Sequence, residues 1–397
     1  MAVVSWPGAN SVHKRQGARL CVHEDGSLTI VDPDPSVLPM LQELDPCFTV
    51  QQEPLPGFSM PRAIATAAIR SGIARASLAS TKSDDLWRAH EIASRVGVLG
   101  CGAEASLLEL KIELARRMLR KCELCGLRCG VDREAGELGR CGLGLDAFVY
   151  EAYVHIAEEP PVNPSLNVSL RGCSLRCRFC QQFPALQPRG SATDVLSAAT
   201  WAQLDFDGAR SLSFVGGNPT ESLPSVLEFM AAAPPNFDVP VVWNSAGYDS
   251  VEALRLLDGV CDAFIPDCKY GNDVCAEELS RVPGYTSVMR AAIGEMCRQG
   301  VPVYVRMLVL PGHANCCHLP CLELLAPYRE QIQLNVLSQY MPDFLIRPSD
   351  GALARRVSSE EVAEVRDAAG RAGFQLMGAD TGDVSQNAGI LHTRDTE

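Results

Sequence analysis

The chain has 397 residues, 47% hydrophobic and 21% charged, a composition typical of a soluble globular protein with a sizeable core. Lys and Arg total 35 against 48 Asp and Glu, and this formal charge of −13 argues against a nucleic-acid binder, because phosphate recognition depends on clustered cations. No apolar stretch approaches the roughly 18 residues of a membrane span, and the N-terminus lacks the apolar core of a signal peptide, so we expect a cytoplasmic protein. A reducing compartment leaves little use for 17 cysteines as disulfides, and we expect some of them to hold metal.

Residues 1–117 are predicted to form an N-terminal region with one hairpin over residues 18–30 and mainly helical structure after residue 62. The clearest helix is expected over residues 103–121, where leucines recur on one stripe. Residues 118–150 follow as a cysteine-rich metal module, residues 151–378 as an α/β domain, and residues 379–397 as a polar tail.

From about residue 164, apolar strands alternate with amphipathic helices, which indicates βαβ units around a parallel sheet. Strands are predicted at residues 166–170, 211–215, 239–243, 263–265, 303–310 and 332–337. Helices are predicted between them, at residues 194–204, 222–232, 250–258 and 286–298. Six units are too few for a closed eight-stranded barrel, so we expect an α/β fold, a partial (β/α)6 barrel, with its active site at the C-terminal ends of the strands.

Three cysteines stand directly after the first predicted strand of this domain, at Cys173, Cys177 and Cys180. Three thiols on one short loop can converge on a single iron–sulfur cluster. Four thiolates close a four-iron cluster, whereas three leave one iron without a protein ligand, and that iron can bind a substrate or cofactor. The alternative is a structural metal knuckle without a recognisable fourth ligand.

This CX3CX2C run, with Phe179 before its last cysteine, resembles that of the radical S-adenosylmethionine (radical SAM) enzymes. The resemblance implies a [4Fe-4S] cluster on the three cysteines, with an open iron that chelates the methionine moiety of S-adenosylmethionine. It also implies reductive cleavage of this cofactor to a 5′-deoxyadenosyl radical that abstracts hydrogen from a substrate. Phe179 is then expected beside the cofactor, which the protein orients and shields.

A glycine pair and an asparagine follow the second predicted strand of the domain, at Gly216, Gly217 and Asn218. Paired glycines let the backbone approach a ligand closely, and in the resembled family this turn holds the amino group of the cofactor. The family has an acid where this chain has Asn218, so that role falls to backbone carbonyls, the Asn218 amide oxygen or Glu221. Without the resemblance these residues would indicate only a turn.

Polar residues follow the next two predicted strands, and one lies inside the strand after them. Asn244 is expected to hydrogen-bond the cofactor, with a local Asx turn as the alternative. Glycyl-radical-enzyme activases carry an Asp-x-Lys at the corresponding place, so the resemblance makes Asp267 and Lys269 cofactor residues, with an exposed ion pair as the alternative. Arg306 lies inside an apolar run and needs a partner, for which we expect a carboxylate or the ribose of the cofactor.

A second set of cysteines precedes the α/β domain, at Cys122, Cys125, Cys129 and Cys141. Four thiolates close a zinc site or a complete iron–sulfur cluster; the spacing leaves both open, and zinc is slightly preferred. The order of this set and of the downstream motifs is similar to uncharacterised radical SAM proteins described as pyruvate formate-lyase activating enzyme-like. The resemblance covers roughly residues 121–374 and includes the runs at residues 158–161, 244–248, 266–270, 310–312 and 339–340.

The other ten cysteines fall into three groups. Cys268 is expected to point away from its two neighbours, because side chains alternate along a strand. Three lie beside two histidines, where a cysteine-containing helix is the simpler interpretation and substrate contact or a third metal is the alternative: His313, Cys316, Cys317, His318 and Cys321. The remaining six are predicted to be small buried hydrophobes: Cys21, Cys47, Cys101, Cys261, Cys275 and Cys297.

The first functional hypothesis is a radical SAM enzyme that abstracts hydrogen, with a glycyl-radical-enzyme partner as its substrate. Modification of a peptide or a small metabolite is the second, because Asn218 and the N-terminal region depart from the activases. A non-catalytic zinc protein that binds a partner is a third hypothesis of a different class. The family implies a reducing electron donor such as flavodoxin or ferredoxin, and we expect neither a nucleic-acid nor a membrane partner.

Overall fold

The computed structural model describes residues 66–377 except 68, 97–102, 157, 188–189, 207 and 235–236, together with the backbone of five strands before residue 52. These strands form an antiparallel sheet of order β2-β3-β4-β1-β5: β1 (Val3–Ser5), β2 (Gly8–Arg15), β3 (Ala18–Gly26), β4 (Leu28–Val31) and β5 (Thr49–Gln51). The pairing of β3 with β4 confirms the predicted hairpin. Cys47, Cys101 and the predicted tail lie outside the described residues.

The helix predicted over residues 103–121 is shorter in the structure. Its first residues instead form β7 (Glu104–Ser106), which pairs with β6 (Arg70–Ala74). The helix α4 (Leu107–Arg117) then begins at a capping box, in which Ser106 and Glu109 each accept the backbone N–H of the other. A further helix, α3 (Ser83–Val96), packs against α4.

The main sheet has eight strands, and its order follows the chain from β8 to β15. The strand β8 pairs antiparallel with β9, and every later pair is parallel. This arrangement confirms the predicted α/β class, and each of the six predicted strands begins and ends within two residues of its predicted bounds. The strands are β8 (Val149–His155), β9 (Ser165–Leu170), β10 (Ser211–Gly216), β11 (Val241–Ser245), β12 (Ala263–Pro266), β13 (Val303–Leu308), β14 (Ile332–Leu337) and β15 (Gln375–Leu376).

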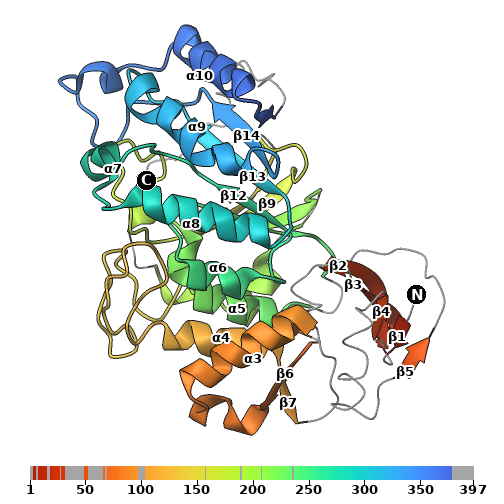
Figure 1. Ribbon diagram of the computed structural model, residues 1–397. Helices are drawn as coiled ribbons and strands as arrows, with labels where there is room; N and C mark the ends of the chain where they lie inside the picture. The colour runs from red at the N-terminus through yellow and green to blue at the C-terminus, as the bar shows by residue number, and fades with distance from the viewer. Residues whose placement is uncertain are drawn as a thin grey trace.

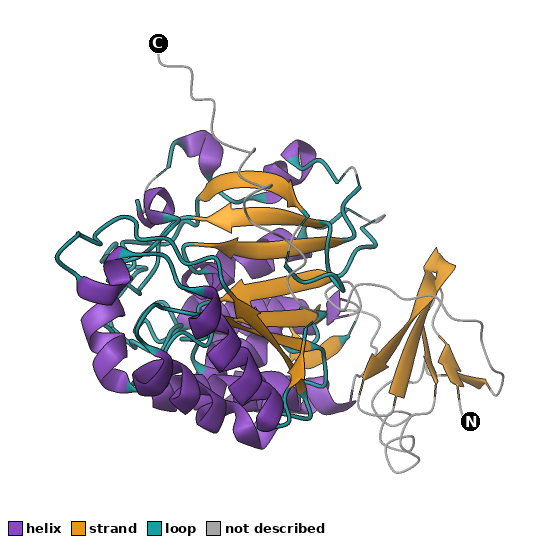
Figure 2. Cartoon of the chain, turned by 90° about the horizontal axis from the view of Figure 1, so that it is seen from above, coloured by secondary structure: helices purple, strands orange, loops and turns teal. Residues whose placement is uncertain are grey.

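The long helices run along one side of these strands (Figures 1 and 2). Three of them confirm predicted helices: α5 (Leu223–Ala231), α6 (Val251–Leu257) and α8 (Tyr285–Arg298). The others are α7 (Asp273–Ser280), α9 (Leu319–Leu325) and α10 (Ser359–Arg371). Because helices cover the outer side of the sheet, β9, β11 and β12 are buried along their whole length, which explains why large apolar residues recur in them.

The α-helix predicted over residues 194–204 is wrong. The segment forms two short 3-10 turns, Ala192–Asp194 and Ala198–Gln203. Between them the chain is extended, because Leu196 donates its N–H to the Ala147 carbonyl at 2.9 Å and Val195 pairs with Phe148. This pairing with the segment ahead of β8 interrupts the helical pattern.

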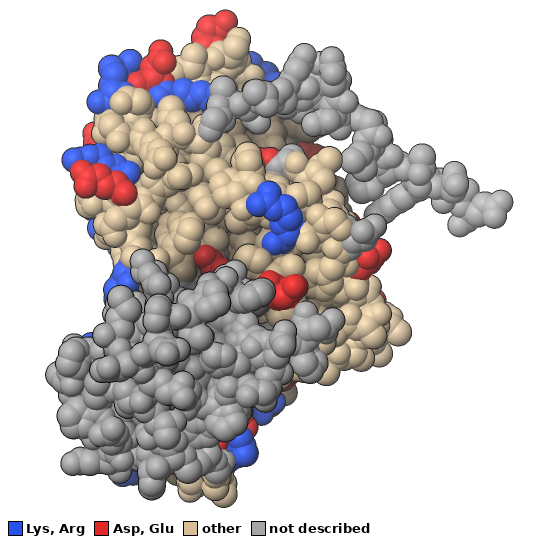
Figure 3. All heavy atoms as spheres, turned by 90° about the vertical axis from the view of Figure 1, so that its right-hand side faces the viewer, with Lys and Arg blue, Asp and Glu red and all other residues tan. Residues whose placement is uncertain are grey.

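Among the described residues, no helix combines the length and the apolar character that a membrane crossing requires. On the face drawn in Figure 3, the described acidic and basic side chains are scattered and often adjacent to one another. The acidic surplus of the sequence is therefore not concentrated on this face.

Candidate functional site

A cavity of about 350 Å³ lies at the C-terminal ends of the parallel strands. Parallel strands place their carboxyl ends along one edge, so residues that follow successive strands meet there although they are distant in sequence. All the residues predicted to bind the cluster or to surround the cofactor line this cavity: Cys173, Cys177, Cys180, Phe179, Gly216, Gly217, Asn218, Asn244, Asp267, Lys269 and Arg306.

The segment that carries the three thiols, residues 173–180, is called the cysteine loop below. The end of α7 holds it in place, because the backbone N–H groups of Arg176 and Arg178 donate to the carbonyls of Ser280 and Leu279 at 2.9 and 2.8 Å. The Cys177 Sγ also lies 2.8 Å from the Ser280 hydroxyl. Burial raises the pKa of the Cys180 thiol to about 11, so a thiolate here needs a compensating cation.

The turn after β10 contacts the start of the cysteine loop directly. Gly216 has a φ of 110°, which side-chain-bearing residues rarely adopt. A Cβ on Gly217 would lie 2.0 Å from the Gly172 carbonyl oxygen, and the Asn218 N–H donates to that same oxygen at 2.9 Å. Since Gly172 precedes the first thiol of the loop, contact between the two turns requires glycine at position 217.

Asn218 lines the cavity, but its amide is engaged within the protein. Its Nδ2 donates to Glu221 at 2.5 Å, and its Oδ1 accepts the Ala246 N–H at 2.9 Å. Glu221 also accepts the Ser174 N–H at 2.7 Å, and its side chain is buried away from the cavity, where desolvation raises its pKa. Two of the three groups suggested for the amino group of the cofactor are thus paired, which leaves the backbone carbonyls of the turn.

Asp267 and Lys269 form an ion pair of 2.5 Å on the cavity wall. Cys268, between them, is fully buried in the core, as strand alternation predicts. Burial alone would lower the pKa of Lys269, but the charges of Asp267 and Cys177 outweigh it and raise this pKa. Lys269 is therefore a stable cation beside the cysteine loop.

Arg306, on β13, lines the cavity, yet its guanidinium already has two carboxylate partners. It contacts Glu158 at 2.6 Å and Glu159 at 2.5 Å, and Asn335 of β14 also donates to Glu159, at 2.9 Å. Both glutamates follow β8, which four strands separate from β13, so these bonds join distant parts of the sheet. The charge that we expected a cofactor to neutralise is therefore neutralised within the protein.

The two glutamates differ in exposure and in their other partners. Glu159 is 1% exposed, whereas Glu158 lines the cavity and also accepts from Gln339 at 2.8 Å. Burial alone would raise the pKa of Glu158, but the His155 hydrogen bond and the charge of Arg306 hold it at about 2. Glu158 is thus an anion on the cavity wall, at the side of β13 and β14.

Two asparagines line the cavity wall, but only one of them, Asn244, was predicted from the sequence as a site residue. Asn244, predicted at the end of β11, is 8% exposed, and no described residue hydrogen-bonds its side-chain amide. Asn167, on β9, and Tyr153 also line the cavity and were missed, while Glu158 and Gln339, which belong to the runs that carry the resemblance, had been given no role in the site. Asn167 is a large polar residue between Leu166 and Val168 in a fully buried strand, and this signal could have indicated it.

The four-cysteine set packs against the β11–α6 connection. Gly126 donates its N–H to the Tyr248 carbonyl at 2.8 Å, and the backbones of Cys125 and Asp249 pair as an isolated antiparallel β-bridge. A Cβ on Gly139 would lie 3.1 Å from the Cys141 Sγ and 3.6 Å from the Cys129 Sγ, so these two thiols face the same point. Burial raises the pKa of Cys141 to about 11.

Among the described residues, no three thiols of this set have their sulfur atoms all within 4.8 Å of one another. In the part of the chain that the structure describes, three ligand atoms come within 4.8 Å of one another only in a separate group, Cys275, His313 and Cys316. Zinc with sulfur ligands at about 2.3 Å would hold neighbouring sulfur atoms roughly 3.8 Å apart. The choice between zinc and an iron–sulfur cluster at the four-cysteine set stays a prediction.

Comparison with known proteins identifies relatives of the domain that carries this cavity. The sequence profile of the Radical SAM superfamily matches residues 167–324. Uncharacterized protein MJ0674 of Methanocaldococcus jannaschii is 30% identical over 280 residues, which cover 68% of this chain and 81% of that protein.

Three solved structures match with low similarity, each at 14% identity. A radical SAM methyltransferase from Sphaerobacter thermophilus has a TM-score of 0.39 over 74% of this chain and 92% of its own. The [FeFe]-hydrogenase maturase HydG has a TM-score of 0.38 over 76% and 64%, respectively. Streptococcus suis SuiB, bound to S-adenosylmethionine, has a TM-score of 0.35 over 52% of this chain, which spans just under half of SuiB (48%).

Proposed function

The chain belongs to the radical SAM superfamily, and from that premise we propose that it cleaves S-adenosylmethionine reductively and abstracts hydrogen from a polypeptide. The observation that carries the proposal is the cavity, because the cysteine loop and every residue expected around the cofactor line it. The superfamily implies a [4Fe-4S] cluster and S-adenosylmethionine. The residues present fit both groups: three thiols on one loop, two buried and one half-buried, a glycine turn and a paired cation.

When bound, the cluster and S-adenosylmethionine supply an electron transfer that breaks the sulfonium and yields a radical able to abstract hydrogen. The residues of the chain hold these groups. Cys173, Cys177 and Cys180 would ligate three irons and leave the fourth without a protein ligand. Cys173 is only 5% exposed, so the loop also keeps water away from the reacting atoms.

The cavity wall offers groups of the right charge for the cofactor. Lys269 presents a cation to the carboxylate of the methionine moiety, and its pairing with Asp267 keeps it protonated. The Asn244 amide, to which no described residue is hydrogen-bonded, is available to the ribose, and the carbonyls of Gly216 and Gly217 to the amino group. Arg306 contributes through Glu158, which it holds in place as an anion.

A polypeptide substrate is supported by apolar side chains beside the cavity, called the apolar rim: Phe183, Met341, Phe344 and Leu345. They are 38–42% exposed, and the rings of Phe183 and Phe344 stack with centroids 5.1 Å apart. The Leu345 N–H donates to the Arg178 carbonyl at 2.9 Å, so the rim adjoins the cysteine loop. Exposed aromatic clusters of this kind are typical of protein-binding surfaces.

The polypeptide we favour is a glycine-containing loop of a glycyl-radical enzyme, the substrate of the activases that the catalytic domain resembles. The Asp267–Lys269 pair, which the activases also carry, supports this assignment. A small metabolite is the alternative substrate, and it would leave the apolar rim without a role. A non-catalytic zinc protein does not agree with membership of the superfamily.

For the four-cysteine set we infer an auxiliary iron–sulfur cluster. In a four-iron cluster each cysteine binds a different iron, so the thiols stand farther apart than around a single ion. The set also adjoins the cysteine loop, because Arg176 of the loop donates to the Arg140 carbonyl, next to Cys141, at 2.5 Å. A reducing donor such as flavodoxin or ferredoxin would supply the electron.

The test is anaerobic reconstitution of the full chain with iron and sulfide, followed by reduction and measurement of 5′-deoxyadenosine. We expect about eight irons per chain and formation of 5′-deoxyadenosine from S-adenosylmethionine. About four irons would contradict the auxiliary cluster alone. Absence of 5′-deoxyadenosine from a fully loaded protein would contradict the cleavage reaction.

The substrate class is tested with deuterium. A candidate glycyl-radical enzyme deuterated at glycine should transfer deuterium into 5′-deoxyadenosine and develop a glycyl-radical signal in electron paramagnetic resonance. Replacing Phe183 and Phe344 by serine should reduce this transfer while leaving uncoupled cofactor cleavage unchanged. Transfer from a deuterated metabolite and from no polypeptide would overturn the assignment.

A further inference from the structure

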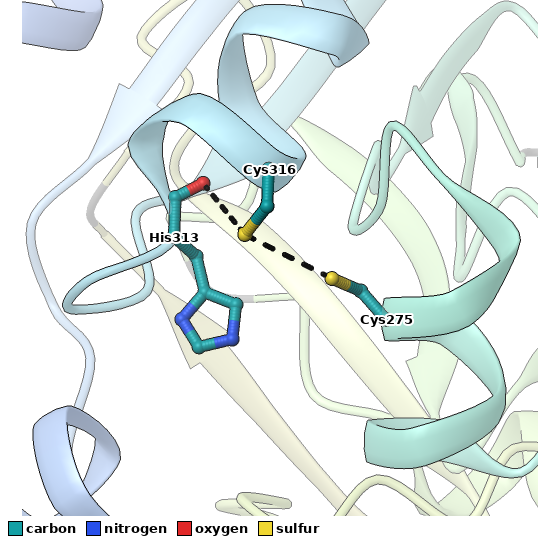
Figure 4. Close-up of side chains that lie close together, drawn as sticks. All are labelled: Cys275, His313 and Cys316. Carbon is teal, nitrogen blue, oxygen red and sulfur yellow. Dashed lines mark hydrogen bonds between the residues drawn. The ribbon is translucent and has the colours of Figure 1, made fainter.

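A second group of metal-ligating side chains lies outside the cavity, and we propose that it binds one zinc ion. The group, called the His313 group, consists of Cys275, His313 and Cys316, whose ligand atoms all lie within 4.8 Å of one another. The two sulfur atoms are 4.0 Å apart. Figure 4 shows the side chains converging from α7 and from the π-helical turn Ala314–His318 with the residue before it. None of the three lines the cavity.

The surrounding backbone fixes this convergence. Asn272 caps α7 by accepting the Cys275 N–H at 2.8 Å, and its Nδ2 donates to the Cys316 carbonyl. The Gly271 N–H donates to the Cys317 Sγ at 3.3 Å, and a Cβ on Gly271 would lie 2.3 Å from the Cys317 carbonyl oxygen. The segment after β12 and the turn after β13 are therefore held against each other without a metal, and the ligands are already in place.

The imidazole is oriented for coordination. Its Nδ1 lies 2.8 Å from the Pro311 carbonyl oxygen, which can only accept a hydrogen bond, so Nδ1 carries the proton. The other nitrogen, Nε2, then has a free lone pair. Metal-binding histidines are usually oriented by such a bond from the second ring nitrogen to a carbonyl or carboxylate.

The geometry of this group fits a zinc ion better than a disulfide or another divalent metal. Tetrahedral zinc with sulfur ligands at about 2.3 Å places the sulfur atoms roughly 3.8 Å apart, close to the 4.0 Å separation of Cys275 and Cys316. A disulfide requires about 2.05 Å, and both cysteines are free. Two thiolates and one imidazole form a borderline-soft ligand set. Such a set binds zinc in preference to magnesium or calcium.

The protein supplies three ligands, so a solvent molecule would take the fourth position. Cys316 is exposed and His313 half-buried, so the group opens to the surface. The neighbouring Cys317 is fully buried and contacts the Lys269 carbonyl at 3.6 Å. A zinc ion here would link the segment that follows Lys269 to the turn after β13, and so stabilise the cavity wall from outside.

The experiment measures metal in the full chain, purified under reducing conditions, stripped with a chelator and loaded with zinc. We expect the wild type to retain one zinc more than Cys316→Ser or Cys275→Ser, with equal iron in all three. The matched control is Cys297→Ser, a partly buried cysteine of α8 outside the group, which should retain that zinc. Loss of a direct ligand should weaken zinc binding beyond the about 10–100-fold typical of losing an outer partner.

Cobalt provides a second readout that does not depend on activity. Cobalt in the wild type should show thiolate charge-transfer absorption and tetrahedral bands that Cys316→Ser lacks. Equal zinc in Cys316→Ser and Cys297→Ser would overturn the proposal, as would zinc that is lost only from Cys129→Ser, or a Cys275–Cys316 disulfide in place of the metal. Because zinc content is measured apart from cofactor cleavage, the proposal and the enzymatic function can fail separately.

Discussion

The cysteine loop and the His313 group lie at the same end of the sheet, yet they arrange their thiols differently. The thiols of the loop are largely buried, line a cavity and have Lys269 beside them. Those of the His313 group stand 4.0 Å apart, with Cys275 buried and Cys316 exposed, and have an imidazole beside them. The number of cysteines alone does not decide what they bind: separation and neighbouring charge distinguish a cluster that activates a cofactor from a single ion.

The largest effect that separates the two groups is expected from Cys177→Ala. This change removes one of three cluster ligands, so formation of 5′-deoxyadenosine should fall by at least about 1,000-fold, the scale of losing an indispensable catalytic group. Cys316→Ala should leave the rate of uncoupled cleavage within about 2-fold, because Cys316 does not touch the cavity. Iron content and 5′-deoxyadenosine are measured side by side. Wild-type rates in Cys177→Ala would remove the basis for assigning the loop.

A second difference is the ion network of Arg306 with Glu158 and Glu159, which stabilises the cavity wall and does not contact the His313 group. The pKa of Glu158 is about 2 in the folded state, below the ordinary value of about 4.3. Its negative charge therefore stabilises the fold fully when the pH is above the ordinary pKa. This stabilisation, roughly 3 kcal/mol, should be lost as pH falls from about 5 to about 2. Unfolding by urea should therefore show Glu158→Gln destabilised at neutral pH and converging with the wild type in acid.

The control for this pH dependence is Glu278→Gln, which changes an exposed carboxylate on α7. Its stability should follow the wild type at every pH, because exposed charges contribute little. A constant difference between Glu158→Gln and wild type across the whole range would show that Glu158 acts through packing and not through its charge.

Lys269→Met tests the cation beside the cysteine loop. A charge-assisted hydrogen bond is worth about 1.5–3 kcal/mol, so the Kd for S-adenosylmethionine should rise about 10–100-fold. The double variant Lys269→Met/Asp267→Asn avoids leaving Asp267 unpaired, and it should bind as weakly as the single variant. Equilibrium dialysis of the reconstituted protein measures both. Unchanged affinity in the double variant would assign the ion pair to structure alone, while zinc in the His313 group should be unaffected in either case.

These differences also show what sequence can and cannot predict. The strands β9 to β14 were located correctly because they are apolar runs between turn signals, whereas β8 is largely exposed and shows no such run. The residues at the strand ends were identified because parallel strands bring them to one edge. The partner of Arg306 was not, because Glu159 lies 147 residues away and only the tertiary fold brings the two together. The His313 group was noticed without Cys275, since α7 joins it only through the tertiary fold.

The smallest effect is expected from Gly217→Ala, in the turn after β10 that contacts the start of the cysteine loop. In Gly217→Ala the new Cβ would lie 2.0 Å from the Gly172 carbonyl oxygen, so the backbone before Cys173 must move. Forcing a methyl group into a packed site costs about 1–3 kcal/mol, and the displaced loop should hold less iron. Gly370→Ala is the matched control, because a Cβ there meets nothing within 4 Å in α10, and helix propensity predicts a gain of about 1 kcal/mol.

Thermal melting and iron content of the two alanine variants separate local from general effects. If Gly217→Ala loses iron while zinc in the His313 group stays, the contact between the two turns positions the cysteine loop specifically. If both metals are lost together, the change has destabilised the whole end of the sheet, and the two groups are not independent. Full iron content in Gly217→Ala would mean that the loop shifts without cost, contrary to the close approach at Gly172.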